Sequence, residues 1–379
     1  MATIIDGSLT PRGKKKSFPN GMKWEQSSIT SGSFYSVYNA NGLWVAAGYS
    51  DNGLYYSTDG KNWTQSTITL GDFRSVYNAN GLWVAVGVSG LYYSTDGKTW
   101  TQSNVTSETF YTVYNANGIW VAGSANGLYY STDGKTWTKS NITSDEFRSV
   151  YNANGIWVAG ESLSKGPYYS TDGKSWTQSK SFYNQVYSVY NANDIWVISA
   201  YNSGLYYSTD GKTWTQSNIT SGSFYSVYNA NGIWVAVGNK GLYYSTDGKA
   251  WTQSNMSSNN FKCVYNTNGI WVAGGNYNTT GLIYSLDGKT WVQSNITSGG
   301  FYSVYSANGI WVSSSQNNKG LYYSPTWEVS TPPRTVSEEW VLRGSVNMTS
   351  PVDLSRQSIN VAFQSALKDY SKISFNVNG

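Results

Sequence analysis

The stretch "YYSTDGKTWTQS", residues Tyr92–Ser103, recurs in near-identical form along most of the 379-residue chain. Seven copies carry the same aspartate, at intervals of 37 to 40 residues. These aspartates are Asp59, Asp96, Asp133, Asp172, Asp210, Asp247 and Asp287. A second motif, related to "VYNANG", occurs eight times in the same phase. A fixed period of this length indicates a repeat architecture, so the repeat decides the fold.

Each repeat divides into four short segments, which in the first copy read "FYSVYNAN", "GLWVAAG", "GLYYST" and "KNWTQS". Asn-Gly between two β-rich runs favours a type I′ hairpin, because that turn needs a positive φ at both central residues. Asp-Gly between the third and fourth segments predicts a second hairpin. Four antiparallel strands in each unit are typical of a β-propeller blade. A β-solenoid is the alternative, although its coils are usually shorter and lack two hairpins per unit.

The number of blades follows from counting the segments. The first three segments occur eight times, whereas the fourth follows an Asp-Gly turn only seven times. An eighth fourth segment, "KWEQSS" from Lys23, stands before the first repeat, and the last repeat lacks the Asp-Gly turn. We therefore predict an all-β, eight-bladed β-propeller of four-stranded antiparallel blades over residues 23–324. Its N-terminal strand would close the ring beside "LYYS" at Leu321 and leave no free sheet edge. Seven blades are the alternative, which leaves one unit unpaired.

The pattern Ser-x-Asp-Gly-x-x-Trp resembles the Asp-box, or bacterial neuraminidase repeat, found on the turn between the third and fourth strands of propeller blades. The resemblance covers about 300 of the 379 residues, and the box here is one residue shorter than usual between aspartate and tryptophan. It implies a structural box on the face away from the ligand. The residues agree, because an aspartate in a tight turn accepts hydrogen bonds from unpaired backbone N–H groups. We predict a structural role for all seven aspartates.

The connections between strands vary unequally. Those after the first and third segments are nearly invariant, whereas those after the second and fourth differ from copy to copy, as in "GESLSKGP" and "GVSG". In an antiparallel blade the two classes lie on opposite faces of the disc. Binding residues usually lie in loops held by a rigid scaffold, so the diversified face is the predicted binding face. Drift in unconstrained loops is the alternative explanation.

A ring of tyrosines and cations is expected near that face, at the start of each first segment. The candidate ligand-binding residues are Tyr35, Arg74, Tyr111, Arg148, Tyr187, Tyr225, Lys262 and Tyr302. Tyrosine supplies a flat apolar surface with a polar tip, which suits sugars or peptides. Packing between neighbouring blades is the alternative interpretation.

The composition argues against most enzyme chemistry. The chain has no histidine and one cysteine, Cys263, so we expect no metal site, no cofactor and no disulfide framework. The resemblance implies an arginine cluster in neuraminidases, but the propeller contains only Arg74 and Arg148, so we predict no enzymatic activity. A glycoside hydrolase would need only a carboxylate pair. The candidates for that pair are Asp72, Glu108, Asp145, Glu146 and Glu161.

The two ends lie outside the repeats. Residues 1–22 form a basic arm, and residues 325–379 read as a linker with a small docking element. Both leave the disc on its uniform face, so we expect them to contact other proteins of a larger assembly. The net charge of +4 lies mostly in the arm, which argues against a nucleic-acid partner. The sequence has no apolar run long enough to predict membrane insertion, and the N-terminus lacks the pattern of a secretory signal.

A repeated, cysteine-poor propeller with docking tails resembles bacteriophage virion proteins. The resemblance implies a non-enzymatic part of the virion, in a tail, baseplate or capsid decoration, whose diversified face binds a glycan or protein receptor on the host surface. A bacterial cell-surface protein, or one secreted without a classical signal peptide, is the alternative location. The alternative functions are an Asp-box glycoside hydrolase acting on surface glycans and a purely structural spacer.

Overall fold

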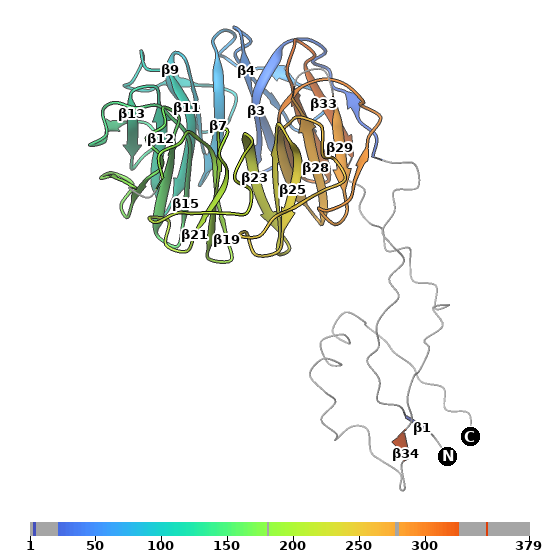
Figure 1. Ribbon diagram of the computed structural model, residues 1–379. Coiled ribbons are helices and arrows are strands. Elements are labelled where there is room, and N and C mark those ends of the chain that lie inside the picture. The colour runs from blue at the N-terminus through green and yellow to red at the C-terminus, as the bar shows by residue number, and fades with distance from the viewer. Residues whose placement is uncertain (1–2, 5–21, 180–181, 277–279, 326–345, 348–379) are drawn as a thin grey trace. The chain divides into compact units, whose positions relative to one another are not determined.

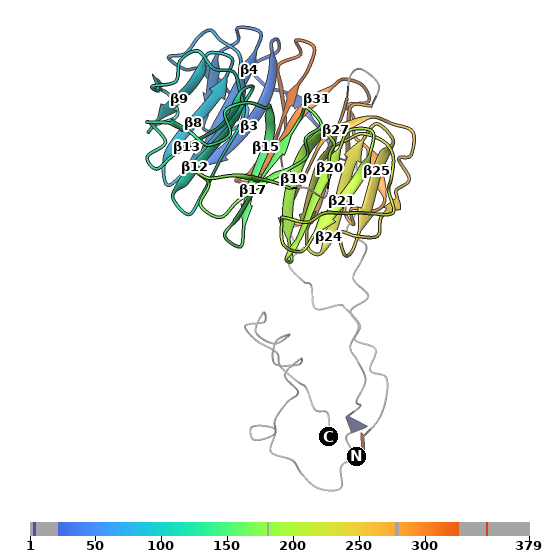
Figure 2. The ribbon, with the colours of Figure 1, turned by 60° about the vertical axis from the view of Figure 1, so that its left-hand side comes forward.

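The computed structural model describes residues 3–4, 22–179, 182–276, 280–325 and 346–347. Eight four-stranded antiparallel sheets form a ring, and Figures 1 and 2 show this ring from two directions. The prediction of eight blades is therefore confirmed, and the seven-bladed and solenoid alternatives are wrong. Among the described residues, no helix is long and apolar enough to cross a lipid bilayer.

In seven blades the four strands follow one another outward from the axis, and in the eighth the outermost position is taken by the N-terminal strand β2. The innermost strands are β3 (Ser33–Ala40), β7 (Phe73–Ala79), β11 (Phe110–Ala116), β15 (Phe147–Ala153), β19 (Val186–Ala192), β23 (Phe224–Ala230), β27 (Phe261–Thr267) and β31 (Phe301–Ala307). The second strands are β4 (Leu43–Tyr49), β8 (Leu82–Gly87), β12 (Ile119–Ser124), β16 (Ile156–Glu161), β20 (Ile195–Ala200), β24 (Ile233–Gly238), β28 (Ile270–Gly275) and β32 (Ile310–Ser315).

The outer half of each blade is shorter. The third strands are β5 (Leu54–Ser57), β9 (Gly90–Ser94), β13 (Gly127–Ser131), β17 (Tyr168–Ser170), β21 (Gly204–Ser208), β25 (Gly241–Ser245), β29 (Leu282–Ser285) and β33 (Leu321–Pro325). The outermost strands are β6 (Thr64–Gln65), β10 (Thr101–Gln102), β14 (Thr138–Lys139), β18 (Thr177–Gln178), β22 (Thr215–Gln216), β26 (Thr252–Gln253), β30 (Trp291–Gln293) and β2 (Glu25–Gln26).

The Asn-Gly pairs make the hairpins that the sequence predicts. Ala40 pairs with Leu43 across a two-residue turn, in which φ is 51° at Asn41 and 82° at Gly42. Positive φ at both positions is the type I′ requirement, which matches the twist of the flanking strands. The fifth blade has the same turn with Asp194 at the glycine position, at φ 61°. The sequence therefore sets the same register in every blade.

The core is divided among the interfaces between blades. Each of eight buried apolar clusters joins two neighbouring blades. In one of them Trp83 and Trp100 of the second blade pack against Val45 and Leu54 of the first. Each cluster combines large aromatic rings with aliphatic side chains, and each such ring buries a large apolar surface.

The ring closes through its own N-terminal strand, as the sequence predicts. β2 pairs antiparallel with β33, with Glu25 opposite Tyr323. Trp24 is 3% exposed and lies in an apolar cluster with Trp311 of the eighth blade. The side chain of Asn295, from the seventh blade, accepts a hydrogen bond from the Trp24 N–H (2.7 Å) and donates one to its carbonyl (2.8 Å).

The chain ends belong to a separate unit that comprises residues 1–15 and 330–379. In it, β1 (Thr3–Ile4) pairs antiparallel with β34 (Val346–Asn347). The sequence predicts no such pairing between the basic arm and the C-terminal element. Met22, the last residue of the predicted arm, is 2% exposed and lies in the same apolar cluster as Trp24. The remaining residues of the predicted arm, and those of the predicted linker and docking element beyond Pro325, lie outside the described residues.

Candidate binding site on the loop face

The diversified connections lie together on one face of the propeller, which we call the loop face. The backbone N–H of Asp51, in a connection after a second strand, donates to the carboxylate of Asp72, in a connection after a fourth strand (3.1 Å). Asn202 and Ser223 make the equivalent contact (3.0 Å) elsewhere in the ring. The Asn-Gly and Asp-Gly turns lie at the opposite strand ends, on what we call the turn face.

Exposed apolar side chains gather on the loop face. Six large hydrophobic residues among those described are at least 40% exposed, and all except Val292 on β30 belong to loop-face connections. The five are Leu70, Val88, Leu163, Tyr183 and Tyr201. Single exposed apolar residues are normal on a protein surface, and these five belong to five different connections of the loop face.

All eight candidate ligand-binding residues occupy the same backbone feature. In each innermost strand the pairing with the second strand shifts by one residue, and the skipped residue is the candidate. In β3, for example, Phe34 and Ser36 pair with β4 whereas Tyr35 does not. This is a β-bulge, which redirects the side chain of the extra residue. We call the eight bulge residues the rim.

One half of the rim alternates tyrosines and arginines. The rings of Tyr35 and Tyr302 lie 4.3 Å apart between centroids. The guanidinium of Arg74 lies 4.5 Å from the ring of Tyr111 and 5.9 Å from that of Tyr35. Arg148 lies 5.2 Å from the ring of Tyr111. Both arginines therefore make cation–π contacts with one tyrosine.

The other half of the rim is built around a lysine. The Nζ atom of Lys262 lies 4.1 Å from the ring of Tyr225 and 6.0 Å from that of Tyr187, two blades away. The rings of Tyr187 and Tyr225 are 5.5 Å apart. Burial lowers the pKa of Lys262, and the positive charge of Arg148 lowers it further.

Glu146 is the carboxylate that contacts the rim. Its side chain pairs with Arg148 (2.5 Å) and accepts hydrogen bonds from the Tyr111 hydroxyl (3.1 Å) and from Ser162 (2.6 Å). Burial alone would raise the pKa of Glu146, but the bonds from Ser162 and Arg148 outweigh burial and lower it. Glu146 is therefore ionised at neutral pH and compensates one of the three cations.

A second, closed ring of eight tyrosines lies on the innermost strands, three residues after each rim position. Neighbouring centroids are 4.8 to 5.1 Å apart all the way round. The members are Tyr38, Tyr77, Tyr114, Tyr151, Tyr190, Tyr228, Tyr265 and Tyr305. We call it the tyrosine ring. The motif "VYNAN" contains these tyrosines in most repeats, but the sequence-based predictions do not include the ring.

The seven predicted structural aspartates lie on the turn face, away from the rim. The Asp210 carboxylate accepts hydrogen bonds from the N–H groups of Lys212 and Thr213 and from the Ser208 hydroxyl, each at 2.8 Å. Burial would raise the pKa of Asp210, but these bonds outweigh it and lower the pKa to about 2. The six other aspartates accept the same set of bonds. Each carboxylate thus satisfies donors of its own turn.

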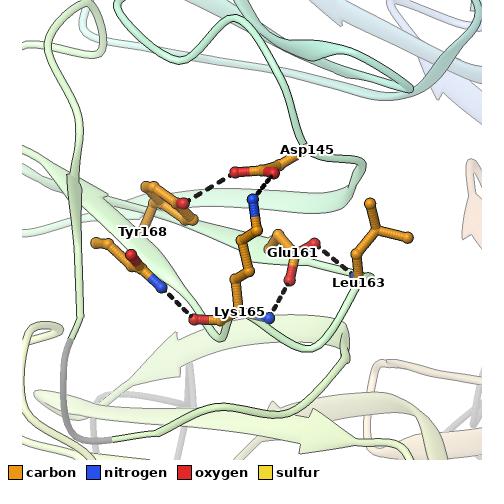
Figure 3. A network of polar contacts seen from close by, with 6 residues as sticks. Asp145, Glu161, Leu163, Lys165 and Tyr168 are labelled. Carbon is orange, nitrogen blue, oxygen red and sulfur yellow. Dashed lines mark hydrogen bonds and ion pairs between the residues drawn. The ribbon is translucent and has the colours of Figure 1, made fainter.

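The carboxylates that are candidates for a hydrolase pair instead bond to groups of the loops around them. Figure 3 shows that the Glu161 carboxylate accepts hydrogen bonds from the N–H groups of Leu163 and Lys165. The Asp145 carboxylate forms an ion pair with the Lys165 ammonium and accepts a hydrogen bond from the Tyr168 hydroxyl. Glu161 is fully buried, and burial raises its pKa.

The other two candidates, Asp72 and Glu108, also bond to a neighbouring loop. Glu108 accepts a hydrogen bond from the Asn126 side chain (3.1 Å), and Asp72 accepts the Asp51 N–H described above. In the described part of the chain, no group of three or more His, Cys, Asp or Glu residues is arranged to hold a metal ion. Cys263 is buried and unpaired.

Comparisons with known proteins show the fold. No family model matches the sequence, and no curated protein does. Among solved structures, the computationally designed Ika8 protein is similar at 10% identity with a TM-score of 0.66, over 80% of this chain and all of that one. Sqt1 of Saccharomyces cerevisiae is similar at 11% identity with a TM-score of 0.59, over 80% of this chain and 98% of that one. YCF48 bound to a D1 peptide is similar at 15% identity with a TM-score of 0.52, over 81% of this chain and 95% of that one.

Proposed function

We propose that this β-propeller is a non-enzymatic binding protein that holds a surface glycan against the rim. One observation supports it above all others: each of the eight rim side chains belongs to the extra residue of a β-bulge. A bulge interrupts the ladder without adding to the core, and bulges are concentrated beside binding and active sites. A ring of eight of them, near the diversified loops, favours binding over an inert spacer.

The chemistry of the rim favours a glycan. Tyrosine rings offer flat apolar surfaces for the C–H faces of sugars, and their hydroxyls together with the cations offer hydrogen bonds. The rings are already held by their neighbours, since Tyr35 packs on Tyr302 and on Tyr49 (4.7 Å). A preorganised surface loses little conformational entropy on binding. A protein receptor is the second candidate, favoured by the exposed Leu163 and Tyr183.

The carboxylates support the non-enzymatic part of the proposal. A glycoside hydrolase needs two carboxyl groups that reach one glycosidic bond, one of them with a raised pKa. Glu161 has a raised pKa but no exposed surface, whereas Glu146 reaches the rim with a lowered pKa. Substitution of Glu146 by Gln should therefore leave glycan hydrolysis at the background rate of the wild type.

The points at which the chain enters and leaves the propeller are compatible with display on a larger assembly, such as a phage virion or a bacterial surface. Glu25, at the start of β2, lies opposite Tyr323, near the end of β33, so the chain enters and leaves the propeller at one strand edge on the turn face. The loop face is therefore free of both ends of the propeller chain. We propose that residues 1–22 and 325–379 contact the other proteins of that assembly.

A glycan array tests the proposal. The full-length protein, presented at high density because single contacts are weak, should bind a defined set of glycans. The double variant Tyr35→Ala/Tyr302→Ala should lose that binding. Tyr56→Ala is the matched control, because Tyr56 also stacks with a lysine, Lys98 (5.4 Å), but lies on the third strand. An array without any bound glycan, or binding that survives the rim variant, would refute the proposal.

A further inference from the structure

We propose that the ligand group held at the centre of the rim is an anion, so that the glycan is an acidic saccharide carrying carboxylate or sulfate groups. The identity of the glycan rests on the proposed function, whereas the anion site rests on the charges described below.

The three cations of the rim are connected to one another through Arg148. Arg74 and Arg148 flank the same ring, that of Tyr111, at 4.5 and 5.2 Å. Lys262 comes from the opposite part of the ring and extends over Tyr225 to within 6.0 Å of Tyr187, two blades away. The charge of Arg148, after burial, is a cause of the lowered pKa of Lys262. Arg148 is therefore linked to both other cations, to Arg74 through the ring of Tyr111 and to Lys262 through its charge.

The rim lacks the negative charge to balance them. Among the described residues there are two ion pairs, Arg148 with Glu146 and Lys165 with Asp145, and neither involves Arg74 or Lys262. The Nε atom of Arg74 is buried and has no hydrogen-bond acceptor among the described residues. A buried donor or charge without a partner is costly, so the site gains free energy when an anion supplies the acceptor.

The type of anion follows from the donors. A guanidinium presents parallel N–H groups that match two oxygens of a carboxylate, sulfate or phosphate group. A lysine ammonium adds a point charge from the other side. The tyrosines around them suit the sugar ring that bears the group. Carboxylate and sulfate groups are both oxyanions, so the expected ligand is a saccharide that bears an oxyanion.

The first experiment uses inorganic sulfate as the probe, against chloride at equal ionic strength. Sulfate should raise the Tm of the full-length protein by about 2 °C or more beyond its general stabilising effect. The variant Arg74→Gln/Lys262→Gln should lose that excess, whereas Arg74→Lys/Lys262→Arg should retain it. Lys61→Gln/Lys98→Gln is the control, because those lysines stack on Tyr323 and Tyr56 away from the rim. An equal sulfate effect in all variants would overturn the inference.

The second experiment repeats the glycan array with neutralised ligands. Methyl esterification removes carboxylate charge and desulfation removes sulfate charge, so the two treatments distinguish the sources of the anion. Each bound glycan should lose about tenfold or more in affinity in one treatment. If neutral forms bind equally and binding still requires Tyr35 and Tyr302, the proposed function holds and the anion inference fails. If sulfate acts at the rim but no glycan binds, the anion site holds and the proposed function fails.

Discussion

A single aspartate organises each Asp-Gly turn at the residue scale. The Asp210 carboxylate closes its turn by accepting two backbone N–H groups and a hydroxyl. We expect Asp210→Ala to lower the free energy of unfolding by about 1 kcal/mol, because it removes these acceptors from a partly exposed turn. Asp210→Asn, which retains an acceptor oxygen, should cost less. Urea denaturation of both variants measures this, and equal losses would contradict the proposed hydrogen-bonding role.

The same carboxylates give the protein a pH dependence. The pKa of all seven lies below the usual value of 3.8, and that of Asp59 and Asp210 is about 2. A lowered pKa in the folded state means stability that is present above the unfolded pKa and is lost as pH falls through the folded one. We expect stability to fall between about pH 4 and pH 2. Denaturation at these two pH values should show a smaller loss for Asp210→Asn than for the wild type.

At the element scale, strand β2 distinguishes the eighth blade from the rest. Asn295 holds the backbone of Trp24, and Asn104 makes the same two bonds to Trp137 (2.9 and 2.8 Å) between blades of continuous chain. We expect Asn295→Ala and Asn104→Ala to destabilise the fold similarly, by about 1–3 kcal/mol. Only Asn295→Ala should speed hydrogen exchange throughout β2 and β33, because it loosens the closing strand.

An open seam would also expose the edge of β33, and an exposed edge favours association with other chains. Light scattering should therefore detect aggregation in Asn295→Ala before Asn104→Ala. If both variants exchange and aggregate alike, the closing strand has no special role in the stability of the ring.

The elements were predictable to different degrees. The four-stranded unit and the closing strand follow from Asn-Gly and Asp-Gly turns and from counting segments, because these signals are local. The bulges were missed, although the sequence carries a sign: buried Phe34 and Val37 are three residues apart, where a regular strand would place them two apart. The pairing of β1 with β34 was missed because it joins segments more than 300 residues apart, which no local pattern specifies.

The sequence predicted where the candidate residues lie but not which side chains they contact. The sequence placed the eight rim residues near the loop face, and the structure shows them stacked across blade boundaries, as the packing alternative also expected. The two interpretations describe the same contacts. The pairing of Glu146 with Arg148 could not be foreseen from spacing, because it depends on the loop conformation that Ser162 also stabilises.

At the scale of the whole molecule, the tyrosine ring connects all eight blades, so its ionisation should accompany unfolding of the whole propeller. Burial raises the pKa of seven of its phenols, among them Tyr77, Tyr190 and Tyr265, above the usual value of 10.0. A raised folded pKa means stability that is complete below the unfolded pKa and is lost as pH rises toward the folded one. We expect stability to fall above about pH 10, and these seven phenols to ionise only on unfolding.

Absorbance of phenolate during an alkaline titration tests this expectation. These seven phenols should titrate together with the loss of the near-ultraviolet circular dichroism signal. Tyr190→Phe should remove one phenol from that cooperative step. Phenols that titrate one by one, in a protein that retains its fold, would contradict the buried ring.

The bulges also bear on how this molecule can change over generations. A bulge residue stands outside the ladder, so its side chain can be replaced without altering the register of the sheet around it. Arg74, Lys262 and the tyrosines at equivalent positions already illustrate such replacement within one chain. Exchange of whole repeats between copies, by recombination, would alter one sector of the rim at a time. Under the proposed function, recognition of a new ligand would therefore arise stepwise, with the fold intact at every stage.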